Sequence, residues 1–276
     1  MTGLDEIIFP MIEKINFKGE TFHIFKNDNG VSKTIKQNES FGFSELKIYK
    51  DILGEDDVFV DVGLNIGAIS FQLKKERPDL QIYGFEPVPE FFTLAAKNLE
   101  RFKNVKLYNV GLGAKNDTIS MGKFNLKAES NYGSSVFDAN GQNVQIPLRR
   151  LDSFKELQKT RPKLVKIDVE GQEDRVVEGM DGLIHDGIFL SLEADRVEST
   201  KRYIQLLKAR KMDLYCGALA VTDRTKSNRD TAYDRHSTVH IFACFREPSF
   251  WMKRLLQKIS GFDEYLEKTA PILGRR

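Results

Sequence analysis

From residue 57 onwards, short continuous runs of apolar residues alternate with segments in which apolar residues recur at helical spacing. A continuous apolar run bounded by turn residues is typical of a strand that is buried on both faces. Strands and helices in alternation predict a parallel sheet with helices on both of its faces. The predicted strands are residues 58–62, 81–85, 106–110, 164–169 and 188–193, and the predicted helices are residues 68–75, 89–102, 173–180 and 198–209.

Two regions depart from this alternation. Residues 117–124 and 143–151 alternate like strands where a helix would continue the pattern. Near the end, residues 212–221 and 237–245 read as strands that are joined by a polar loop of 15 residues, TDRTKSNRDTAYDRH. This loop is too short and too hydrophilic for a packed crossover helix, so the last two strands are predicted to be antiparallel. The predicted fold is α/β: a Rossmann-like, doubly wound, mostly parallel sheet with an antiparallel final strand and helices on both faces.

A shorter segment is predicted on either side of this central domain, which covers residues 57–246. Residues 1–56 form an N-terminal lead-in packed on the domain, with a short helix, a hairpin and a second helix near residues 44–53. The hairpin is placed at Asn27–Gly30, because Asn and Gly tolerate the positive φ of a tight turn.

The C-terminal tail, residues 247–276, has apolar residues at helical spacing with basic residues between them, which predicts an amphipathic helix. Its apolar positions are Phe250, Trp251, Leu255, Leu256 and Ile259. Three roles are open for this helix: packing on the chain's own core, a homodimer contact, or a weak contact with an anionic membrane surface.

Bulk composition limits the function classes without selecting one. The 276 residues are 41% apolar, and a net charge of +2 without a dense run of Lys and Arg gives no reason to expect a nucleic acid partner. Cys216 and Cys244 both lie in apolar runs, which favours two reduced thiols over a disulfide. The first residues contain acids where a secretory signal needs positive charge, and no stretch approaches the roughly 20 apolar residues of a membrane span. We expect a cytoplasmic protein without a transmembrane segment.

The stretch VFVDVGLNIGAIS, Val58–Ser70, places a glycine turn between the first predicted strand and helix. Gly63 and Gly67 allow a sharp turn and the close approach of a ligand to the backbone. The dinucleotide fingerprint has a further glycine where Asn65 stands, and no Gly-Lys-Ser/Thr follows as in a P-loop. We therefore expect a ligand that is not held by phosphate at this turn, with Asp61 receiving an ammonium group directly or through water.

Glu86 ends the second predicted strand, in the sequence FEPVP. An acid at this position can accept hydrogen bonds from both ribose hydroxyls of an adenosine cofactor, whether NAD or S-adenosylmethionine (SAM). The missing glycine and the antiparallel final pair favour SAM, because a parallel sheet with such a final hairpin is typical of class I SAM-dependent methyltransferases. The predicted cofactor contacts are Asp61, Gly63, Asn65, Gly67, Glu86, Pro87, Gly111 and Asp168.

Five stretches, in this order, resemble the FkbM family of SAM-dependent methyltransferases: VFVDVGLNIGAIS, YGFEPVPEFFTLAAKN, VGLGAKNDTIS, LRRLDSF and LVKIDVEGQEDRVVEGM. The resemblance covers residues 57–193, about half of the chain, and Leu64 stands where the family usually has alanine. It implies O-methylation of hydroxyls on sugars and natural products, including surface polysaccharides and glycolipids.

The candidate chemistry lies at the carboxyl ends of the predicted strands, where open α/β sheets bind their ligands. Methyl transfer requires that the acceptor oxygen be aligned and that a nearby group accept its proton. The predicted catalytic residues are Asp168, Glu193 and His236, whereas His240 lies in an apolar alternation and reads better as a core histidine. No metal is assigned, although the carboxylates of Asp168, Glu170 and Glu193 would suit Mg²⁺.

Two polar segments are predicted to contact the acceptor, because loops over the strand ends usually carry specificity. Residues 125–141 combine amides and hydroxyls with Tyr132, as a sugar-binding surface would. The loop of residues 222–236 offers Arg224 and Arg235 to an anionic part such as a nucleotide diphosphate, with a solvated loop as the alternative. Glu170 completes the predicted acceptor contacts.

The sequence thus predicts a SAM-dependent O-methyltransferase that acts on a sugar hydroxyl of a surface polysaccharide, a glycolipid or a glycosylated metabolite. The acceptor is expected to be a small molecule or a glycan, including nucleotide-linked or lipid-linked sugars. One alternative is methyl transfer to a nitrogen or a carboxyl of a small molecule. Another is a non-catalytic interaction subunit with a SAM-binding fold, against which the acids at the predicted strand ends argue.

Overall fold

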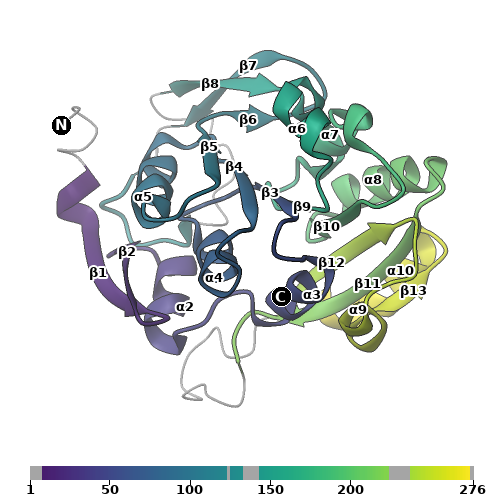
Figure 1. Cartoon of the computed structure of the whole chain (residues 1–276), viewed down its shortest axis with the longest axis horizontal. Helices are drawn as coiled ribbons and strands as arrows, with labels where there is room; N and C mark the ends of the chain where they lie inside the picture. The colour runs from purple at the N-terminus through teal and green to yellow at the C-terminus, as the bar shows by residue number, and fades with distance from the viewer. Residues whose placement is uncertain (1–7, 123–124, 133–142, 224–236, 274–276) are drawn as a thin grey trace.

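The structure, a computed structural model, describes residues 8–122, 125–132, 143–223 and 237–273. Figure 1 shows a central sheet with helices packed on both of its faces. In the described part of the chain, no helix is long and apolar enough to cross a membrane.

Eight strands form the central sheet: β3 (Val58–Val62), β4 (Gln81–Phe85), β5 (Val105–Tyr108), β9 (Leu164–Ile167), β10 (Phe189–Glu193), β11 (Asp213–Ala220), β12 (Ser237–Cys244) and β13 (Gln257–Ile259). Their order across the sheet is β13-β11-β12-β10-β9-β3-β4-β5. The strands from β10 to β5 are parallel, whereas β12 lies between β10 and β11 and runs antiparallel to both. The predicted fold class is confirmed, including the antiparallel pair at the end.

The alternating side chains of each central strand enter two different hydrophobic cores. In β3, Val58, Val60 and Val62 face one core and Phe59 faces the other. Asp61 therefore points to the same side of the sheet as Phe59. Polar residues at the equivalent positions of the neighbouring strands share this side, and they form the candidate site described below.

Helices cover both faces of the sheet (Figure 1). The face that includes Phe59 packs against α3 (Phe43–Ile52), α4 (Ala68–Glu76) and α9 (Phe250–Leu255), and α5 (Pro89–Leu99) packs beside α4. The opposite face packs against α6 (Lys155–Thr160), α7 (Glu173–Glu178), α8 (Val197–Ala209) and α10 (Phe262–Leu273). Cys216 and Cys244, both free and buried, lie in cores on opposite sides of the sheet.

The N-terminal lead-in contains a hairpin, but the turn is not where the sequence predicted it. After the short helix η1 (Phe9–Met11), β1 (Ile12–Phe17) pairs with β2 (Glu20–Phe25) through a turn at Lys18 and Gly19, which both have positive φ. Asn27–Gly30 instead leads into α2 (Val31–Asn38), where Asp28 accepts hydrogen bonds from the N–H groups of Gly30 and Ser32. The predicted hairpin turn at these residues is therefore wrong, because they precede and cap a helix instead.

A second, smaller sheet lies beyond β5, at the top of Figure 1. It contains β6 (Gly111–Leu112), β7 (Asp117–Gly122) and β8 (Asn143–Arg149) in the order β6-β8-β7, in agreement with the strand-like alternation of this region. The short helices η3 (Leu151–Ser153) and η4 (Asp181–Leu183) pack near α6.

The C-terminal tail is not the single amphipathic helix that the sequence predicted. It forms α9, then the edge strand β13, which pairs with β11, and then α10. Leu256 and Ile259 are buried, whereas Phe250 is 63% exposed, so the predicted apolar face is divided between separate elements. Ser260 and Gly261 lie between β13 and α10.

Candidate functional site

The turn between β3 and α4 has an unusual backbone. Gly63, Asn65 and Gly67 have φ values of +79°, +52° and +82°. A Cβ on Gly63 would lie 1.8 Å from the backbone oxygen of Asp168, so only glycine lets this turn lie against the end of β9. Asn65 accepts a hydrogen bond from the N–H of Ile66 through its own Oδ1 (2.8 Å), which supports the left-handed conformation.

Glu86 follows β4 directly and is bound to this turn. Its Oε2 accepts a hydrogen bond from the N–H of Asn65 (2.8 Å), and its Oε1 accepts one from the N–H of Val88 (2.9 Å). Burial raises the pKa of the Glu86 carboxyl to about 7, although both N–H groups favour the charged form. Each carboxylate oxygen keeps a further lone pair, so the group can accept hydrogen bonds from two neighbouring hydroxyls.

Lys166, in β9, is a buried cation that the sequence analysis missed. Its Nζ lies 3.4 Å from Oδ1 of Asp61 and 3.3 Å from Oδ2 of Asp168, and it donates a hydrogen bond to the backbone oxygen of Gly63 (3.2 Å). Burial opposes the charge, but Asp168 and Asp61 outweigh this effect and raise the pKa of Lys166. A lysine inside the apolar run LVKI was the available signal, because a buried ammonium needs an acid beside it.

This lysine changes the expected role of Asp61. The Asp61 side chain is 1% exposed, its Oδ2 accepts a hydrogen bond from Oγ of Ser70 (2.7 Å), and burial raises its pKa. The ammonium group beside Asp61 is therefore that of Lys166. Asp61 binds the ammonium group of Lys166, and this ammonium group donates a hydrogen bond to the backbone oxygen of Gly63 in the glycine turn.

Asp168 and Glu193 form a pair of acids at the ends of β9 and β10. Burial and the charge of Asp168 raise the pKa of Glu193 well above its ordinary value, and the Glu193 side chain hydrogen-bonds Asp168. Burial acts against the charge of Asp168, but Lys166 and the bond from Glu193 outweigh it and lower the pKa of Asp168. These opposite pKa shifts favour the negative charge of the pair on Asp168, whose side chain is 34% exposed.

Glu170 lies beside this pair and is bound to a cation of its own. Its Oε2 accepts a hydrogen bond from Nη2 of Arg196 (2.8 Å), while burial and the charge of Asp168 raise its pKa to about 7. Carboxylate oxygens of Asp168, Glu170 and Glu193 lie within 4.8 Å of one another. Because Lys166 and Arg196 already face two of these three acids, we assign no metal to them.

Glu173 fixes the loop that carries Asp168 and Glu170, a role that the sequence analysis did not give it. Its Oε1 accepts hydrogen bonds from the N–H groups of Val169 (3.2 Å) and Gly171 (3.0 Å), and its Oε2 accepts one from Oγ of Ser199 (2.8 Å). Its position three residues after Glu170, at the start of α7, is the only signal of this role in the sequence.

Tyr132 is a core residue in this structure. It is 2% exposed, its ring packs against Phe25 and Phe91, and its hydroxyl donates to the backbone oxygens of Leu126 and Ala128. It therefore offers no aromatic face to a sugar, and we correct its predicted place among the acceptor contacts. An aromatic residue in a polar insertion can anchor that insertion to the core, and sequence alone does not distinguish the two roles.

Pro87 and Gly111 lie side by side, because a Cβ on Gly111 would be 3.6 Å from Cβ of Pro87. Gly111 begins β6 of the small sheet, next to the end of β5. His236, Arg224 and Arg235 lie outside the described residues, so their predicted roles stay predictions.

His240 is buried in β12, as expected of a core histidine, yet its surroundings are polar. It is 2% exposed, and its Nε2 lies 2.9 Å from Oγ1 of Thr238 and 3.7 Å from Oε1 of Glu45. Its Nδ1 has no hydrogen-bond partner in the described part of the chain.

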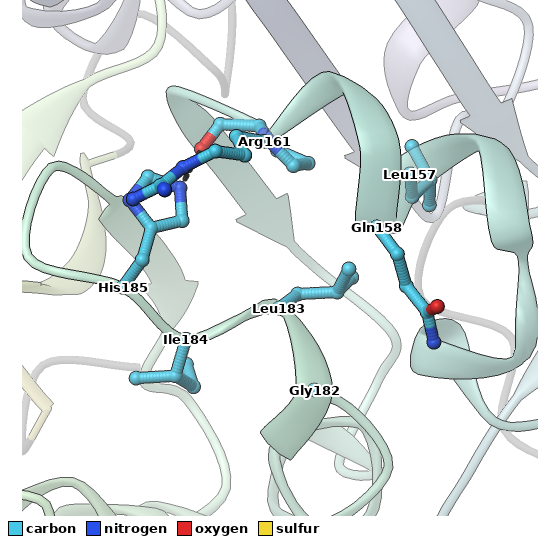
Figure 2. Close-up of a pocket in the computed structure, with 8 residues that line it drawn as sticks. Leu157, Gln158, Arg161, Gly182, Leu183, Ile184 and His185 are labelled. Carbon is cyan, nitrogen blue, oxygen red and sulfur yellow. Dashed lines mark hydrogen bonds between the residues drawn. The ribbon is translucent and has the colours of Figure 1, made fainter.

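A separate pocket of about 210 Å³, drawn in Figure 2, is lined by residues that precede β9 and β10, at the ends of these strands away from the site. Arg161 and His185 line one side of it, and Gln158 of α6 lines the other. It contains none of the residues that the sequence predicted to bind a ligand.

The family model and the curated relatives that match this chain are all methyltransferases. The sequence model described as "Methyltransferase FkbM domain" matches residues 61–215. Among curated relatives, "Methyltransferase 1" of Beauveria bassiana is 28% identical, with 46% of this chain and 59% of that protein covered. "Hexuronic acid methyltransferase AglP" of Haloferax volcanii is 27% identical, with 64% and 68% covered, and "2-O-methyltransferase NoeI" of Sinorhizobium fredii is 25% identical, with 49% and 64% covered.

Among solved structures, precorrin-6y C5,15-methyltransferase of Geobacter metallireducens GS-15 has a TM-score of 0.48 and 15% identity, covering 73% of this chain and 87% of that one. This distant likeness bears on neither cofactor nor acceptor. The family match, in contrast, spans more than half of the chain and includes the glycine turn, Glu86 and the acids of β9 and β10. The chain therefore belongs to the FkbM methyltransferase family.

Proposed function

We propose that this chain is a SAM-dependent O-methyltransferase whose acceptor is a hydroxyl group of a sugar. The observation that carries the proposal is Glu86: a buried carboxylate at the end of the second parallel strand, with both oxygens oriented by backbone N–H groups. Such a group suits the two hydroxyls of a ribose. The acids at the ends of β9 and β10, two and three strands away, would then be near the methyl acceptor.

The residues around the glycine turn fit an adenosine cofactor with a charged amino-acid end. Gly63, Asn65 and Gly67 give the turn its left-handed backbone, Pro87 follows Glu86 in the chain, and Gly111 lies beside Pro87. We propose these residues, with Glu86, as the cofactor contacts. The exposed part of Asp168 would face the amino-acid end, and Asp61 would act from behind, through Lys166.

The bound cofactor would supply a methyl group that its sulfonium has already activated. The chain's own task is then to align the acceptor oxygen and accept its proton. Asp168 suits this task, because it is the charged and partly exposed member of its pair with Glu193. Glu193 holds Asp168 by a hydrogen bond, and Lys166 keeps Asp168 ionised.

The names of two relatives support a sugar as the acceptor. AglP is named for a hexuronic acid and NoeI for a 2-O position, and both align with part of this chain at 25–27% identity. A hydroxyl acceptor also agrees with acids at the strand ends, because a hydroxyl needs a base whereas an amine often does not. We therefore favour O-methylation over transfer to nitrogen or to a carboxyl.

Isothermal calorimetry tests the cofactor, and radiolabel transfer tests the reaction. The purified chain should bind S-adenosylhomocysteine and not NADH, and should transfer labelled methyl from SAM into a glycan fraction. The variant Glu86→Gln should bind the cofactor about 10- to 100-fold more weakly, whereas Glu90→Gln, a buried acid in the first turn of α5, should keep the original affinity. Equal binding of S-adenosylhomocysteine by Glu86→Gln and by the unchanged chain would refute the assignment of the ribose site.

A further inference from the structure

A second group of polar residues lies beneath the pair Asp168–Glu193, between α3 and the sheet. It comprises Glu45 and Tyr49 of α3, Ser191 of β10 and His240 of β12. Glu45, Tyr49 and His240 lie outside residues 61–215, the part of the chain that matches the family. All four are buried, with Glu45 7% exposed. Burying polar groups costs folding free energy unless they are hydrogen-bonded, so we ask what function these four residues serve.

His240 stands next to Glu193. The antiparallel register of β10 and β12 pairs Glu193 directly with His240, so the two side chains leave the same face of the sheet as cross-strand neighbours. One ring nitrogen, Nε2, is occupied by Thr238 and faces Glu45. The other, Nδ1, is buried and has no hydrogen-bond partner among the described residues. A buried imidazole thus has one nitrogen available, and its cross-strand neighbour is the acid Glu193.

Glu45 is held in place from α3. Its Oε1 accepts a hydrogen bond from the hydroxyl of Tyr49 (2.9 Å), which also lies 2.9 Å from Oγ of Ser191. The helix therefore places a carboxylate 3.7 Å from Nε2 of His240, on the side of the ring away from Nδ1. Glu45, the imidazole of His240 and Glu193 thus follow one another in space. In this arrangement Glu45 orients the ring and stabilises its charged form.

We propose that His240, oriented by Glu45 and Thr238, is a positioning residue that takes the proton of Glu193 while Asp168 accepts the proton of the acceptor hydroxyl. The proposal rests on the proposed function and adds to it. The acceptor O–H bond breaks and its proton goes to Asp168. Glu193 gives its own proton to Nδ1 of His240. The acceptor oxygen forms a bond to the methyl carbon as the carbon–sulfur bond breaks. The acid pair keeps one proton throughout, and the new positive charge lies on His240, facing Glu45.

Among the described residues, the charged and titratable groups placed around His240 come from three elements: Glu45 and Tyr49 from α3, Lys166 and Asp168 from β9 and its end, and Glu193 from β10. The acids of this set outnumber its single cation, Lys166. A positive charge on His240 is therefore compensated on both sides of the ring.

Nitrogen NMR of the imidazole rings tests the contact without any acceptor. The chain has four histidines, so His240 can be assigned from the signals that disappear in His240→Gln. We expect Glu193→Gln and Glu45→Gln each to shift the ring-nitrogen signals of His240. Glu170→Gln, which alters an acid bound to Arg196, should shift them less. Signals of His240 that do not respond to Glu193→Gln would overturn the proposal.

The pH dependence of methyl transfer provides the second readout. With a glycan fraction that the unchanged chain methylates, His240→Gln should lower kcat about tenfold or more, alter the pH profile of kcat and leave the affinity for S-adenosylhomocysteine unchanged. His185→Gln changes a histidine at the amino ends of β9 and β10, away from the site. Its kcat and pH profile should match those of the unchanged chain. A kcat within twofold of the unchanged chain and an unaltered pH profile would contradict the proposal. No transfer by the unchanged chain to any glycan would refute the proposed function instead, while the NMR result still decides on His240.

Discussion

At the scale of single residues, the site is built from charged groups that are buried at a cost. Glu86 keeps a carboxylate where burial favours its neutral form, and Lys166 keeps an ammonium between two acids. Glu86 could be proposed from the sequence alone, because an acid directly after a predicted strand can be read from the residue order. It did not identify the role of Lys166, because whether a lysine in an apolar run is paired depends on Asp61, which is distant in the chain.

Glu86→Gln should weaken the binding of S-adenosylhomocysteine about 10- to 100-fold, since it removes a charge-assisted hydrogen-bond acceptor. The same change should stabilise the empty protein. The pKa of Glu86 is about 7 in the folded chain against 4.5 ordinarily, so the folded chain holds a proton that the unfolded chain has released. Stability from this group is therefore lost as the pH rises from about 4.5 to about 7, and Glu86→Gln should recover up to about 3 kcal/mol at pH 8. Denaturant unfolding at pH 5 and pH 8 measures this difference.

Cofactor affinity should itself depend on pH through Glu86. Ribose hydroxyls donate to the charged carboxylate, so the protonated form binds them less well. We expect the affinity for S-adenosylhomocysteine to fall as the pH drops below about 7, and this dependence to be much reduced in Glu86→Gln. A pH-independent affinity in the unchanged chain, measured by calorimetry from pH 5.5 to 8.5, would show that Glu86 does not contact the cofactor.

Gly63→Ala tests the close approach of the glycine turn to β9. A Cβ there would lie 1.8 Å from the backbone oxygen of Asp168, and φ is +79°, so the turn must move. We expect a loss of about 2–5 kcal/mol in unfolding free energy, together with weaker cofactor binding. Gly261→Ala is the matched control, because nothing lies within 4 Å of its added Cβ. Thermal unfolding of both variants distinguishes the two cases, and equal melting temperatures would contradict the contact.

At the scale of elements, the regular pattern was predictable and the local anchors were not. Strands β3 and β4 have the predicted bounds, because continuous apolar runs between turn residues leave little choice. The turn residues Asn27–Gly30 predicted a hairpin but begin α2, because Asp28 binds the first N–H groups of that helix. The loop after β9 depends on Glu173, which binds two N–H groups of the loop and accepts a hydrogen bond from Ser199 only when α7 and α8 come together.

Glu173→Gln should loosen the loop that carries Asp168 and Glu170. The amide can keep one of the two acceptor positions, so we expect a loss of about 1–3 kcal/mol in unfolding free energy and a lower rate of methyl transfer. Hydrogen exchange at the N–H of Gly171 should become faster, because this group is bound to Oε1 of Glu173. Glu178→Gln, at the exposed end of the same helix, should behave like the unchanged chain. If exchange at Gly171 stayed the same in both variants, Glu173 would not fix the loop.

At the scale of the whole molecule, segments outside the family match support the site from both ends of the chain. Helix α3 covers the polar face of the sheet, and α10 reaches the end of β10, where the hydroxyl of Tyr265 donates to the backbone oxygen of Ala194 (2.6 Å). Packing on the core was one of the three roles that the sequence left open for the tail. The prediction that the tail forms one continuous helix is wrong. Periodicity alone could not reveal β13, because strand pairing with β11 decides the structure of those residues.

Tyr265→Ala should destabilise the molecule by about 3–5 kcal/mol, because it removes a fully buried ring and its hydrogen bond next to Glu193. Phe250→Ala, at a ring that is 63% exposed, should change the unfolding free energy by less than about 0.5 kcal/mol. Denaturant unfolding compares the two. Similar losses in both variants would mean that the tail does not pack as the structure describes.

Methyl transfer to a sugar hydroxyl is tested most directly by mass spectrometry of glycans from cells with and without the gene. We predict that one glycan loses a single methyl group on a sugar oxygen when the gene is removed. Incubation of that glycan with the purified chain and SAM should restore the methyl group, and incubation with Glu86→Gln should not. Identical glycans in both cells, together with no transfer by a chain that binds S-adenosylhomocysteine, would contradict a sugar hydroxyl as the acceptor.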